Sequence, residues 1–576
     1  MYRLQYYYTS AIVLMVLIVS IYGSIDTHPI SKTGFYTFNQ RVDHNGVNVK
    51  TFPQRYCINK SFVHKGAAPK SVMLVLGGEG PIDPEITNHI PFIGVANNTN
   101  SIIIALEIRY YGESIPVPNM STDNMQYLTT DQILDDIAYF QTQFTNLYGL
   151  HNCKWIVMGC SYAGSLSAWY RMKYPNLAAA AIASSAPIRA VVSFHDYDRK
   201  VREALGLQCT KQFKQILNHV EQQLRVNNTS IKRKFTCDAK IDDKMFLFML
   251  SEAISYSVQY NSRFKIISNI CPPLIQSGSN IVKLLDIFAD YITNMFLFKN
   301  GSCNEYNLYS FASTKVDYSG TRQWTYQLCS EYGWFLTASD SDLSLKSGQI
   351  NEQWWENEVC KIMFGSSMKP FVEKINLEYG IDNMKMLTNV LFTNGGYDPW
   401  SSLSVQSQCD TPLSNIISIP GESHCANWYS ETPEDSQQLK NSRSLANSFL
   451  TEFIESDCNP DDCTKKKGLC IQKKDTETIA SSICICPSVE CDRKQGIVSR
   501  ITLRILAEDL QDTELVIEES HLLNSSGNTS QSQSQSSHQQ MTMSESGSNQ
   551  LLVLQHSEFI ISIVTLNLFV LFYKFI

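Results

Sequence analysis

The sequence predicts an α/β fold built on a parallel β-sheet. Short apolar runs bounded by turn residues lie at 71–76, 101–106 and 155–158. Continuous apolar runs of this length are typical of parallel strands covered on both faces, because neither face meets water. The third run leads through a small-residue turn into residues 165–174, which have helical character. Buried strands and a strand–turn–helix unit together indicate the α/β class.

The turn after the third run carries a serine, because the run ends in Gly-Cys-Ser at Ser161. A strand, a tight turn with Ser and a helix form the nucleophile elbow of an α/β-hydrolase. Small neighbours leave the hydroxyl exposed, and the helix N–H groups face a developing oxyanion. The fit to Gly-x-Ser-x-Gly is imperfect, since Ala163 precedes the glycine at Gly164. A chance Gly-Ser turn is the alternative.

Two later apolar runs each lead to an acid or a base. The run at 386–392 precedes Asp398, and the run at 415–419 precedes His424. Each residue has an alternative: Asp398 as a turn residue before proline, and His424 as a surface or core histidine. In an α/β-hydrolase the acid and then the base follow the serine along the chain, and each lies in a loop that directly follows a strand. The joint pattern predicts a catalytic triad of Ser161, Asp398 and His424.

The composition excludes some classes of function. A chain of 576 residues exceeds one compact core, so several domains are expected. The formal net charge is -8 and no segment is basic enough to form a nucleic-acid surface, which disfavours nucleic acid as a partner. A Ser-His-Asp mechanism ends with hydrolysis of an acyl-enzyme by water, so we expect neither a metal nor an organic cofactor.

The cysteines and the N-terminus indicate a secretory route. Seventeen cysteines favour an oxidising compartment, and residues 1–23 have the pattern of a signal peptide, with an apolar run at 11–19. An uncleaved membrane anchor is the alternative, although the run is short for a span. Eight Asn-x-Ser/Thr acceptors support secretion weakly. They are Asn59, Asn97, Asn119, Asn227, Asn228, Asn300, Asn524 and Asn528.

The C-terminal part differs in composition. Six cysteines within 458–491 predict a small EGF-like disulfide module, with zinc binding as an alternative that a secretory route disfavours. The other eleven cysteines are odd in number, and we expect Cys160, beside the serine, to be unpaired. Residues 492–549 read as a linker and a Ser/Gln-rich disordered stalk. The apolar segment 550–576 predicts a GPI-attachment signal or a transmembrane anchor at the cell surface.

Several short motifs follow one another in a fixed order between about residues 35 and 455. They are FNQRVDH at 38–44, TFPQRY at 51–56, GGEGP at 77–81, EIRYYGES at 107–114, YLT at 127–129, GCSY at 159–162, SSAP at 184–187, WTYQLCSEYG at 324–333, NGGYDPW at 394–400 and SHC at 423–425. Through them the chain resembles the serine peptidase family of lysosomal prolyl carboxypeptidase, dipeptidyl peptidase II and thymus-specific serine protease. Ile108 and Leu336 depart from that pattern, where a His and a Gln are expected.

Residues 189–385 contain longer segments of helical period, such as 211–223 and 244–258. They separate the first hydrolase part, 33–188, from the second, 386–455. Lids over α/β-hydrolase sites are usually inserted at this position, between the nucleophile elbow and the acid loop. Members of the family carry a helical cap here. We therefore predict a helical cap that admits short peptides rather than folded proteins.

Further site residues follow from the fold and the resemblance. Tyr162, after the serine, is expected to donate one backbone N–H to an oxyanion hole. From the sequence alone, the loop after the first apolar run could equally be an oxyanion-hole loop or a simple Gly-rich turn. The resemblance favours the first, with Gly78 and Glu79 as candidates to donate the second backbone N–H. We assign no metal ligand among the candidate site residues.

Three residues are candidates for substrate binding. Trp400 and Trp428 follow the acid and the base closely, and their flat side chains would wall a slot for a prolyl ring. Core packing is the alternative for both, although the family's Asp-Pro-Trp motif includes Trp400. Glu331 lies in the most family-like motif of the cap and is expected to recognise substrate or to make a structural hydrogen bond within the cap.

The sequence thus predicts a serine exopeptidase acting on short peptides, and the resemblance implies cleavage after proline. Whether it is a carboxypeptidase or a dipeptidyl peptidase stays open. An esterase or lipase on the same fold is one alternative, and a surface adhesion protein with an inactive hydrolase domain is another. The expected setting is the cell surface, the lysosome or vacuole, or the extracellular space, and a homodimer is compatible with the sequence.

Overall fold

The computed structural model of the protein describes residues 34–46, 50–297, 303–316, 318–407 and 410–456, with four short strands beyond them. The chain divides into two units, 1–499 and 500–576. The predicted signal peptide, the stalk, the C-terminal apolar segment and most of the predicted EGF-like module lie outside the described residues. No helix within the described ranges is long and apolar enough to cross a membrane.

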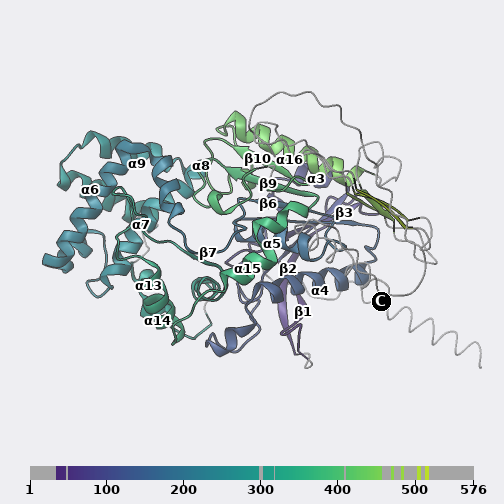
Figure 1. Ribbon diagram of the computed structural model, residues 1–576, viewed down its shortest axis with the longest axis horizontal. Coiled ribbons are helices and arrows are strands. Elements are labelled where there is room, and N and C mark those ends of the chain that lie inside the picture. The colour runs from purple at the N-terminus through teal and green to yellow at the C-terminus, as the bar shows by residue number, and fades with distance from the viewer. Residues whose placement is uncertain are drawn as a thin grey trace, which may run out of the picture. The chain divides into compact units, whose positions relative to one another are not determined.

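An eight-stranded sheet forms the centre of the first unit (Figure 1). Its strands are β1 (Tyr36–Arg41), β2 (Thr51–Asn59), β3 (Ser71–Leu76), β4 (Ser101–Leu106), β5 (Lys154–Cys160), β6 (Ala180–Ser184), β9 (Val390–Gly395) and β10 (Asn415–Ile419). Their order is β1-β2-β4-β3-β5-β6-β9-β10. Strand β2 is antiparallel to both of its neighbours, and all the other pairs are parallel. This order and the single reversed strand are those of an α/β-hydrolase, which confirms the predicted fold class.

The side chains of the central strands alternate between two apolar cores. In β3, Val72 and Leu74 belong to one buried cluster, whereas Met73 and Val75 belong to the other. Residues of a strand point to opposite faces in turn, so both faces must be covered. Helices α4 (Thr130–Tyr148) and α5 (Tyr162–Lys173) pack into the first cluster. Helices α3 (Ile93–Asn98) and α16 (Gln437–Glu455) pack into the second.

Two of the motifs meet in a buried polar network beside the sheet. Arg109 donates to both carboxylate oxygens of Asp136 at 2.5 and 2.6 Å, and His44 contacts the same carboxylate at 2.7 Å. Gln40 donates to the Asp136 carbonyl oxygen at 3.0 Å. A bidentate Arg–carboxylate pair satisfies charges that would be costly to bury alone. The motifs at 38–44 and 107–114 therefore hold β1 and the loop after β4 to α4.

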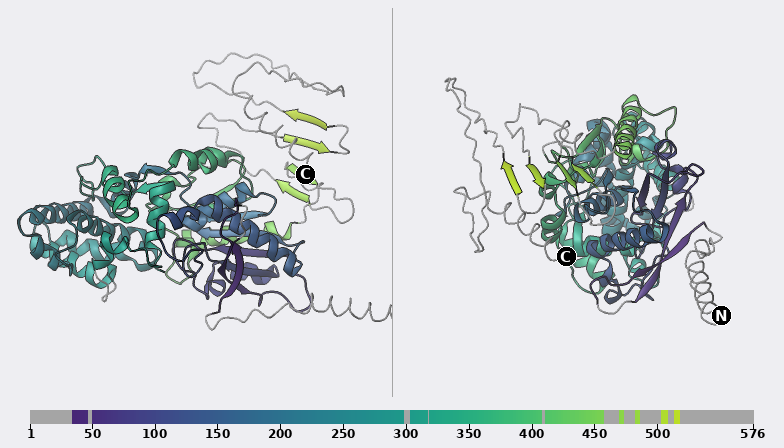
Figure 2. Two further views of the ribbon diagram at one scale, coloured as in Figure 1. Left: turned by 90° about the horizontal axis from the view of Figure 1, so that it is seen from below. Right: turned by 90° about the vertical axis from the view of Figure 1, so that its right-hand side faces the viewer.

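The segment between β6 and β9 is mostly helical. Its elements are β7 (Val191–Ser193), α6 (Asp196–Lys234), α7 (Asp243–Gln259), α8 (Asn261–Phe264), α9 (Ile266–Gln276), α10 (Ile281–Tyr291), η2 (Ile292–Phe296), η3 (Cys303–Tyr306), α11 (Leu308–Phe311), α12 (Thr321–Gln327), η4 (Leu328–Tyr332), β8 (Gly333–Phe335), α13 (Glu352–Trp354), η5 (Trp355–Cys360), α14 (Lys361–Phe364), α15 (Val372–Tyr379) and η6 (Ile381–Met386). Helices α6, α7 and α9 pack together to one side of the sheet in Figure 1, and the teal helices of this segment lie on the same side in the left view of Figure 2. The predicted helices at 211–223 and 244–258 fall within α6 and α7.

Three disulfides lie within this segment: Cys209–Cys271, Cys237–Cys303 and Cys329–Cys360. The apolar run at 386–392, interpreted as a buried strand, is only partly a strand, because β9 begins at Val390. The preceding residues form the 3₁₀ helix η6, and Asn389 has a φ of 59°, a left-handed conformation that interrupts an extended backbone.

The remaining elements are short. They are α2 (Ile86–His89), η1 (Asp123–Tyr127), η7 (Ser401–Leu403) and η8 (Ala426–Trp428). Within the predicted EGF-like module, β11 (Leu469–Gln472) pairs antiparallel with β12 (Ser482–Ile485), which sets Cys470 opposite Cys484. In the second unit, β13 (Leu503–Ala507) pairs antiparallel with β14 (Thr513–Ile517).

Candidate active site

Ser161 lies at a sharp turn between β5 and α5. Its φ of 60° and ψ of -129° form a conformation that costs a non-glycine residue about 1–3 kcal/mol. The Ser161 N–H donates to the Ser184 carbonyl at the end of β6 at 2.9 Å, and Ser165 N–H donates to the Ser161 carbonyl at 3.0 Å. These bonds hold the turn, so the side chain projects at the start of a helix, as the sequence predicts for a nucleophile elbow.

The structure explains the displaced glycine of this motif. A Cβ on Gly159 would lie 2.5 Å from the Ala163 backbone, and a Cβ on Gly164 would lie 2.7 Å from the Ser184 carbonyl oxygen. Gly159 therefore lets the helix begin directly over the strand, and Gly164 lets α5 approach β6. Position 163 does not require glycine, because there is room for the Cβ of Ala163 in the apolar core.

Asp398 and His424 form a buried pair. His424 Nδ1 and Asp398 Oδ1 are 2.8 Å apart, and the two residues are 3% and 0% exposed. Trp400 N–H donates to the same Asp398 oxygen at 2.9 Å. His424 Nε2 is buried and has no hydrogen-bond partner among the described residues. With Nδ1 engaged by the carboxylate, Nε2 is the nitrogen left to exchange a proton with a reacting group.

The sheet brings these residues to one edge. Ser161, Asp398 and His424 follow the carboxyl ends of β5, β9 and β10, and these strands run parallel in neighbouring positions with only β6 between β5 and β9. Ligand sites of open α/β sheets lie at this edge. The structure therefore places the three predicted residues together, although no hydrogen bond joins Ser161 to His424.

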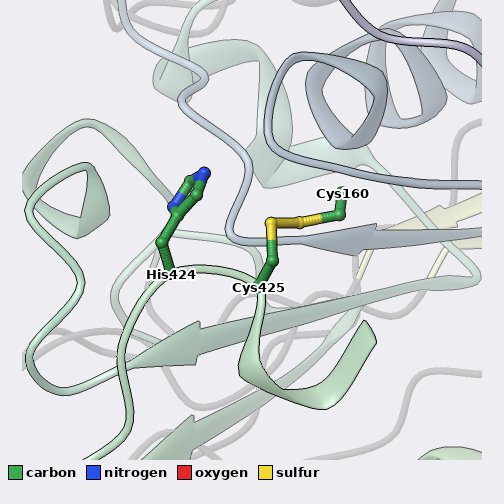
Figure 3. Close-up of side chains that lie close together, drawn as sticks. All are labelled: Cys160, His424 and Cys425. Carbon is green, nitrogen blue, oxygen red and sulfur yellow. A yellow bond between two sulfur atoms is a disulfide. The ribbon is translucent and has the colours of Figure 1, made fainter. Parts of the chain in front are cut away.

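A disulfide joins Cys160 to Cys425, so the expectation that Cys160 is unpaired is wrong (Figure 3). The odd count could not identify the unpaired cysteine, because proximity depends on the fold. Among the described residues, Cys57 and Cys153 are the free cysteines. Cys409 lies outside the described ranges.

The disulfide and His424 also form a group of potential metal ligands, with ligand atoms within 4.8 Å of one another. Both sulfurs are held in the disulfide, and metal ions bind thiolates rather than disulfide sulfurs. The arrangement therefore gives no reason to assign a resident metal here.

The loop that carries His424 is anchored by the helical segment. His424 N–H donates to the Gln259 carbonyl at the end of α7 at 3.2 Å. Ser262 N–H donates to Ser423 Oγ at 2.8 Å, and Ser423 N–H donates to Ser262 Oγ at 2.7 Å. The Gln259 side chain also accepts hydrogen bonds from Trp400 Nε1 at 3.1 Å and Tyr197 at 2.8 Å. Sequence reasoning missed Gln259 and Ser262, because no motif marks them.

The predicted oxyanion donors follow the carboxyl ends of β3 and β5, which are neighbouring parallel strands. Tyr162 is the first residue of α5, and Gly78 and Glu79 follow β3. Glu79 is exposed, yet enough protein surrounds its carboxyl group for desolvation to raise the pKa, while nearby His424 opposes that rise. The Glu79 carboxylate also accepts a hydrogen bond from its own backbone N–H. Because the Glu79 N–H is engaged in this bond, Gly78 is the better candidate for the second donor.

A buried polar network lies behind Tyr162. Its hydroxyl accepts a hydrogen bond from Gln327 at 2.7 Å and lies 3.2 Å from the Tyr332 hydroxyl. Tyr332 bonds Thr130 at 2.5 Å, and the Thr130 hydroxyl donates to Glu331 at 3.0 Å. The motif at 324–333 thus supports the residue after the elbow serine through a chain of hydrogen bonds.

Glu331 lies at the far end of this network. It is 8% exposed, and the Thr130 backbone N–H, at the start of α4, donates to both of its carboxylate oxygens at 3.0 and 3.1 Å. Desolvation raises the Glu331 pKa to about 7, although the hydrogen bonds from Thr130 oppose the rise. These bonds join the helical segment to α4, outside the cap within which a structural bond was expected.

The two tryptophans differ in their surroundings. Trp400 lies beside His424, with ring centres 6.4 Å apart, and its ring also contacts Phe194 and Trp334 at 5.4 and 5.9 Å. Trp428 instead packs edge-to-face on Phe92 in the second core cluster, at 6.2 Å. The structure thus gives Trp400 a place at the site and gives Trp428 a core contact.

Of the predicted glycosylation acceptors, Asn97, Asn119, Asn227 and Asn228 are exposed and Asn59 is half-buried. Asn59 donates to the Asn88 side chain at 2.7 Å. Asn300, Asn524 and Asn528 lie outside the described residues.

The sheet order and the elbow define the chain as an α/β-hydrolase. The sequence profile of the family called serine carboxypeptidase S28 matches residues 40–446, and the chain belongs to this family. It is therefore a serine-type peptidase by family.

Curated relatives cover the same region. The chain is 30% identical over 414 residues to "Probable serine protease EDA2" of Arabidopsis thaliana, across 69% of this chain and 82% of the relative. It is 28% identical over 441 residues to the thymus-specific serine protease of Mus musculus, across 71% and 85% of the two chains. It is 25% identical over 451 residues to the lysosomal Pro-X carboxypeptidase of Bos taurus, across 72% and 87%. The family resemblance predicted from the motifs is confirmed.

Proposed function

We propose that the protein is a serine exopeptidase that hydrolyses short peptides with Ser161, His424 and Asp398. The observation that carries the proposal is the 2.8 Å bond between His424 Nδ1 and Asp398 Oδ1, which leaves Nε2 of a buried ring free. Nε2 takes the Ser161 proton as the hydroxyl attacks the peptide carbonyl, and returns it to the leaving amine. Asp398 orients the ring and stabilises the imidazolium. Water then hydrolyses the acyl-enzyme by the same proton route.

The oxyanion of each tetrahedral intermediate is stabilised by backbone N–H groups. Tyr162 offers one at the start of α5, where the helix dipole also favours negative charge. Gly78 offers the second, and Glu79 a further one once its carboxylate turns away from its own N–H. The hydrogen-bond chain behind Tyr162 keeps the first donor in place.

The substrate is a short peptide cleaved after proline. Trp400 next to His424 supplies a flat apolar wall that suits a prolyl ring, and one relative carries Pro-X in its name. The helical segment 189–385 acts as a cap, since Gln259 and Ser262 of this segment contact the His424 loop directly. A cap so close to the base restricts entry to chain ends, which supports exopeptidase rather than endopeptidase action.

The setting we infer is the secretory pathway, with delivery to a lysosome, the cell surface or the medium. The disulfides support an oxidising compartment. The signal peptide at 1–23, the EGF-like module at 458–491 and the anchor at 550–576 remain proposals from the sequence.

Two assays test the function. A fluorophosphonate should label the wild type at Ser161, and Ser161→Ala should abolish both labelling and peptide turnover. Ser444→Ala, at an exposed position of α16, is the matched control and should behave as the wild type. Full peptidase activity in Ser161→Ala would contradict the proposal.

Mass spectrometry of digested proline-containing peptides then defines the mode of cleavage. Loss of one C-terminal residue after proline identifies a carboxypeptidase, and release of N-terminal dipeptides identifies a dipeptidyl peptidase. Turnover of esters alone would replace the peptidase with an esterase. Absence of labelling would favour an inactive adhesion protein.

A further inference from the structure

The disulfide between Cys160 and Cys425 joins the neighbours of two proposed catalytic residues. Cys160 directly precedes Ser161, and Cys425 directly follows His424. The bond spans a sequence separation of 265 residues, and the two Cα atoms are 5.9 Å apart. The disulfide lies beside the His424 ring (Figure 3). A covalent link of a few bonds therefore fixes how far the nucleophile and the base can separate.

The backbone on both sides of the link is in an unfavourable conformation. Ser161 has a φ of 60° and Cys425 a φ of 57°, a left-handed region that non-glycine residues leave unless the surroundings hold them. The end of β6 provides part of that support. Cys425 N–H donates to Ser185 Oγ at 2.9 Å, and Ser161 N–H donates to the Ser184 carbonyl. The disulfide adds a covalent constraint to these hydrogen bonds.

This disulfide is also the one most open to reduction among those in the described residues. Cys160 is partly exposed, whereas Cys425 is 8% exposed and every cysteine of the other three disulfides is 6% exposed or less. A thiolate must reach a sulfur atom to attack it, so access favours this bond.

We propose that the Cys160–Cys425 disulfide is a redox-sensitive positioning element that holds His424 against Ser161. The inference rests on the proposed function, because it assigns the two neighbours their roles. A dithiol reductant attacks one sulfur of the disulfide through one thiolate, which releases the other cysteine and forms a mixed disulfide. The second thiolate of the reductant then attacks the reductant's own sulfur in that mixed disulfide, so the remaining cysteine is released and the reductant leaves as a cyclic disulfide. Two electrons and two protons pass to Cys160 and Cys425, which become thiols, and exchange with a small-molecule disulfide, which accepts the two electrons and two protons, restores the bond.

Reduction removes the covalent constraint, while the hydrogen bonds that the His424 and Cys425 N–H groups donate to Gln259 and Ser185 remain. The fold is therefore retained, and the His424 loop gains freedom to shift. A displacement of the base by about 1 Å lowers a catalysed rate by roughly 100-fold. Reduction should act on the rate of acylation and leave binding of the acylating agent largely unchanged.

The first test uses the full chain and graded dithiothreitol. The rate of fluorophosphonate labelling is measured before reduction, after reduction and after reoxidation, and alkylation with mass spectrometry maps the thiols that open. We expect labelling to slow roughly 10- to 100-fold as Cys160 and Cys425 become alkylated, with recovery on reoxidation. An unchanged rate with both cysteines reduced would overturn the inference.

The second test uses matched double variants. Cys160→Ala with Cys425→Ala should lower the maximal inactivation rate as reduction does, keep the inhibitor constant within about twofold, and abolish the response to dithiothreitol. Cys209→Ala with Cys271→Ala should keep both the wild-type rate and the response. If this control no longer responded to dithiothreitol, the effect would belong to the Cys209–Cys271 disulfide and the proposal would be refuted.

The two proposals fail in different ways. Oxidised wild type that takes no label would refute the serine peptidase mechanism itself. Oxidised wild type that is labelled at a rate indifferent to the state of Cys160 and Cys425 would refute only the role of the disulfide. If the double variant does not fold, reduction of the folded wild type still decides the question.

Discussion

The carbonyl oxygen of Gln259 accepts a hydrogen bond from the backbone N–H of His424 at 3.2 Å. Gln259 is the last residue of α7, in the helical segment, whereas His424 follows the last strand of the sheet. The side chain of Gln259 also bonds Trp400, two residues from Asp398. One residue of the inserted segment thus contacts the loops of both the acid and the base.

Truncation of this side chain tests its role as a positioning residue. Gln259→Ala removes the bonds to Trp400 and Tyr197 and keeps the backbone bond to His424. We expect kcat to fall roughly 10-fold, because the tryptophan and the acid loop lose an orienting contact. Steady-state kinetics with Gln276→Ala, an exposed position at the end of α9, as the control will measure it. Equal kinetics in the two variants would exclude the role.

The acid is expected to matter through the orientation of the histidine. Asp398→Asn replaces the acceptor of the 2.8 Å bond from His424 Nδ1 and favours the wrong tautomer of the ring. We expect kcat to fall roughly 10⁴-fold with the fold intact. Asp382→Asn, whose side chain is 92% exposed, should have no effect. A loss below tenfold in Asp398→Asn would remove Asp398 from the mechanism.

The elbow glycine is expected to be intolerant of any side chain. Gly164→Ala places a Cβ 2.7 Å from the Ser184 carbonyl oxygen, so α5 must move away from β6. We expect the free energy of unfolding to fall by about 1–3 kcal/mol, with slower labelling of Ser161. Gly94→Ala, where nothing lies within 4 Å, is the control in α3 and should be tolerated. Chemical denaturation measures both, and equal stability of the two variants would contradict the close approach.

The raised pKa of Glu331 predicts how the free energy of unfolding depends on pH. Its pKa is about 7 in the folded protein against an ordinary 4.5, because burial disfavours the charged carboxylate. Because the folded protein holds the Glu331 proton more tightly than the unfolded chain does, the contribution of Glu331 to the free energy of unfolding is complete below pH 4.5. This contribution is lost as pH rises through 7. The loss should be on the order of 3 kcal/mol.

Denaturation of wild type and Glu331→Gln between pH 4 and 8 measures this effect. The amide can accept the Thr130 N–H bond and carries no charge, so its stability should vary less over this range. Glu431→Gln, at an exposed position, should keep the wild-type slope. A wild-type slope in Glu331→Gln would mean that another group titrates.

The sequence by itself determined the class of fold and the three residues of the proposed triad. Runs that are buried on both faces, such as β3 and β4, carry their apolar pattern in the chain itself. A nucleophile elbow needs small residues at fixed spacing, and the acid and base loops directly follow strands. These are local requirements, so neighbouring residues reveal them.

Only the tertiary structure decided what holds those residues together. The pairing of Cys160 with Cys425, the bonds of Gln259 to two catalytic loops and the burial of Glu331 against Thr130 all join residues at least 141 positions apart. A cysteine count does not reveal which thiols meet, and no motif marks a glutamine at a helix end. Partners so distant in sequence are set by how the helical segment packs on the sheet, and that packing depends on the whole chain.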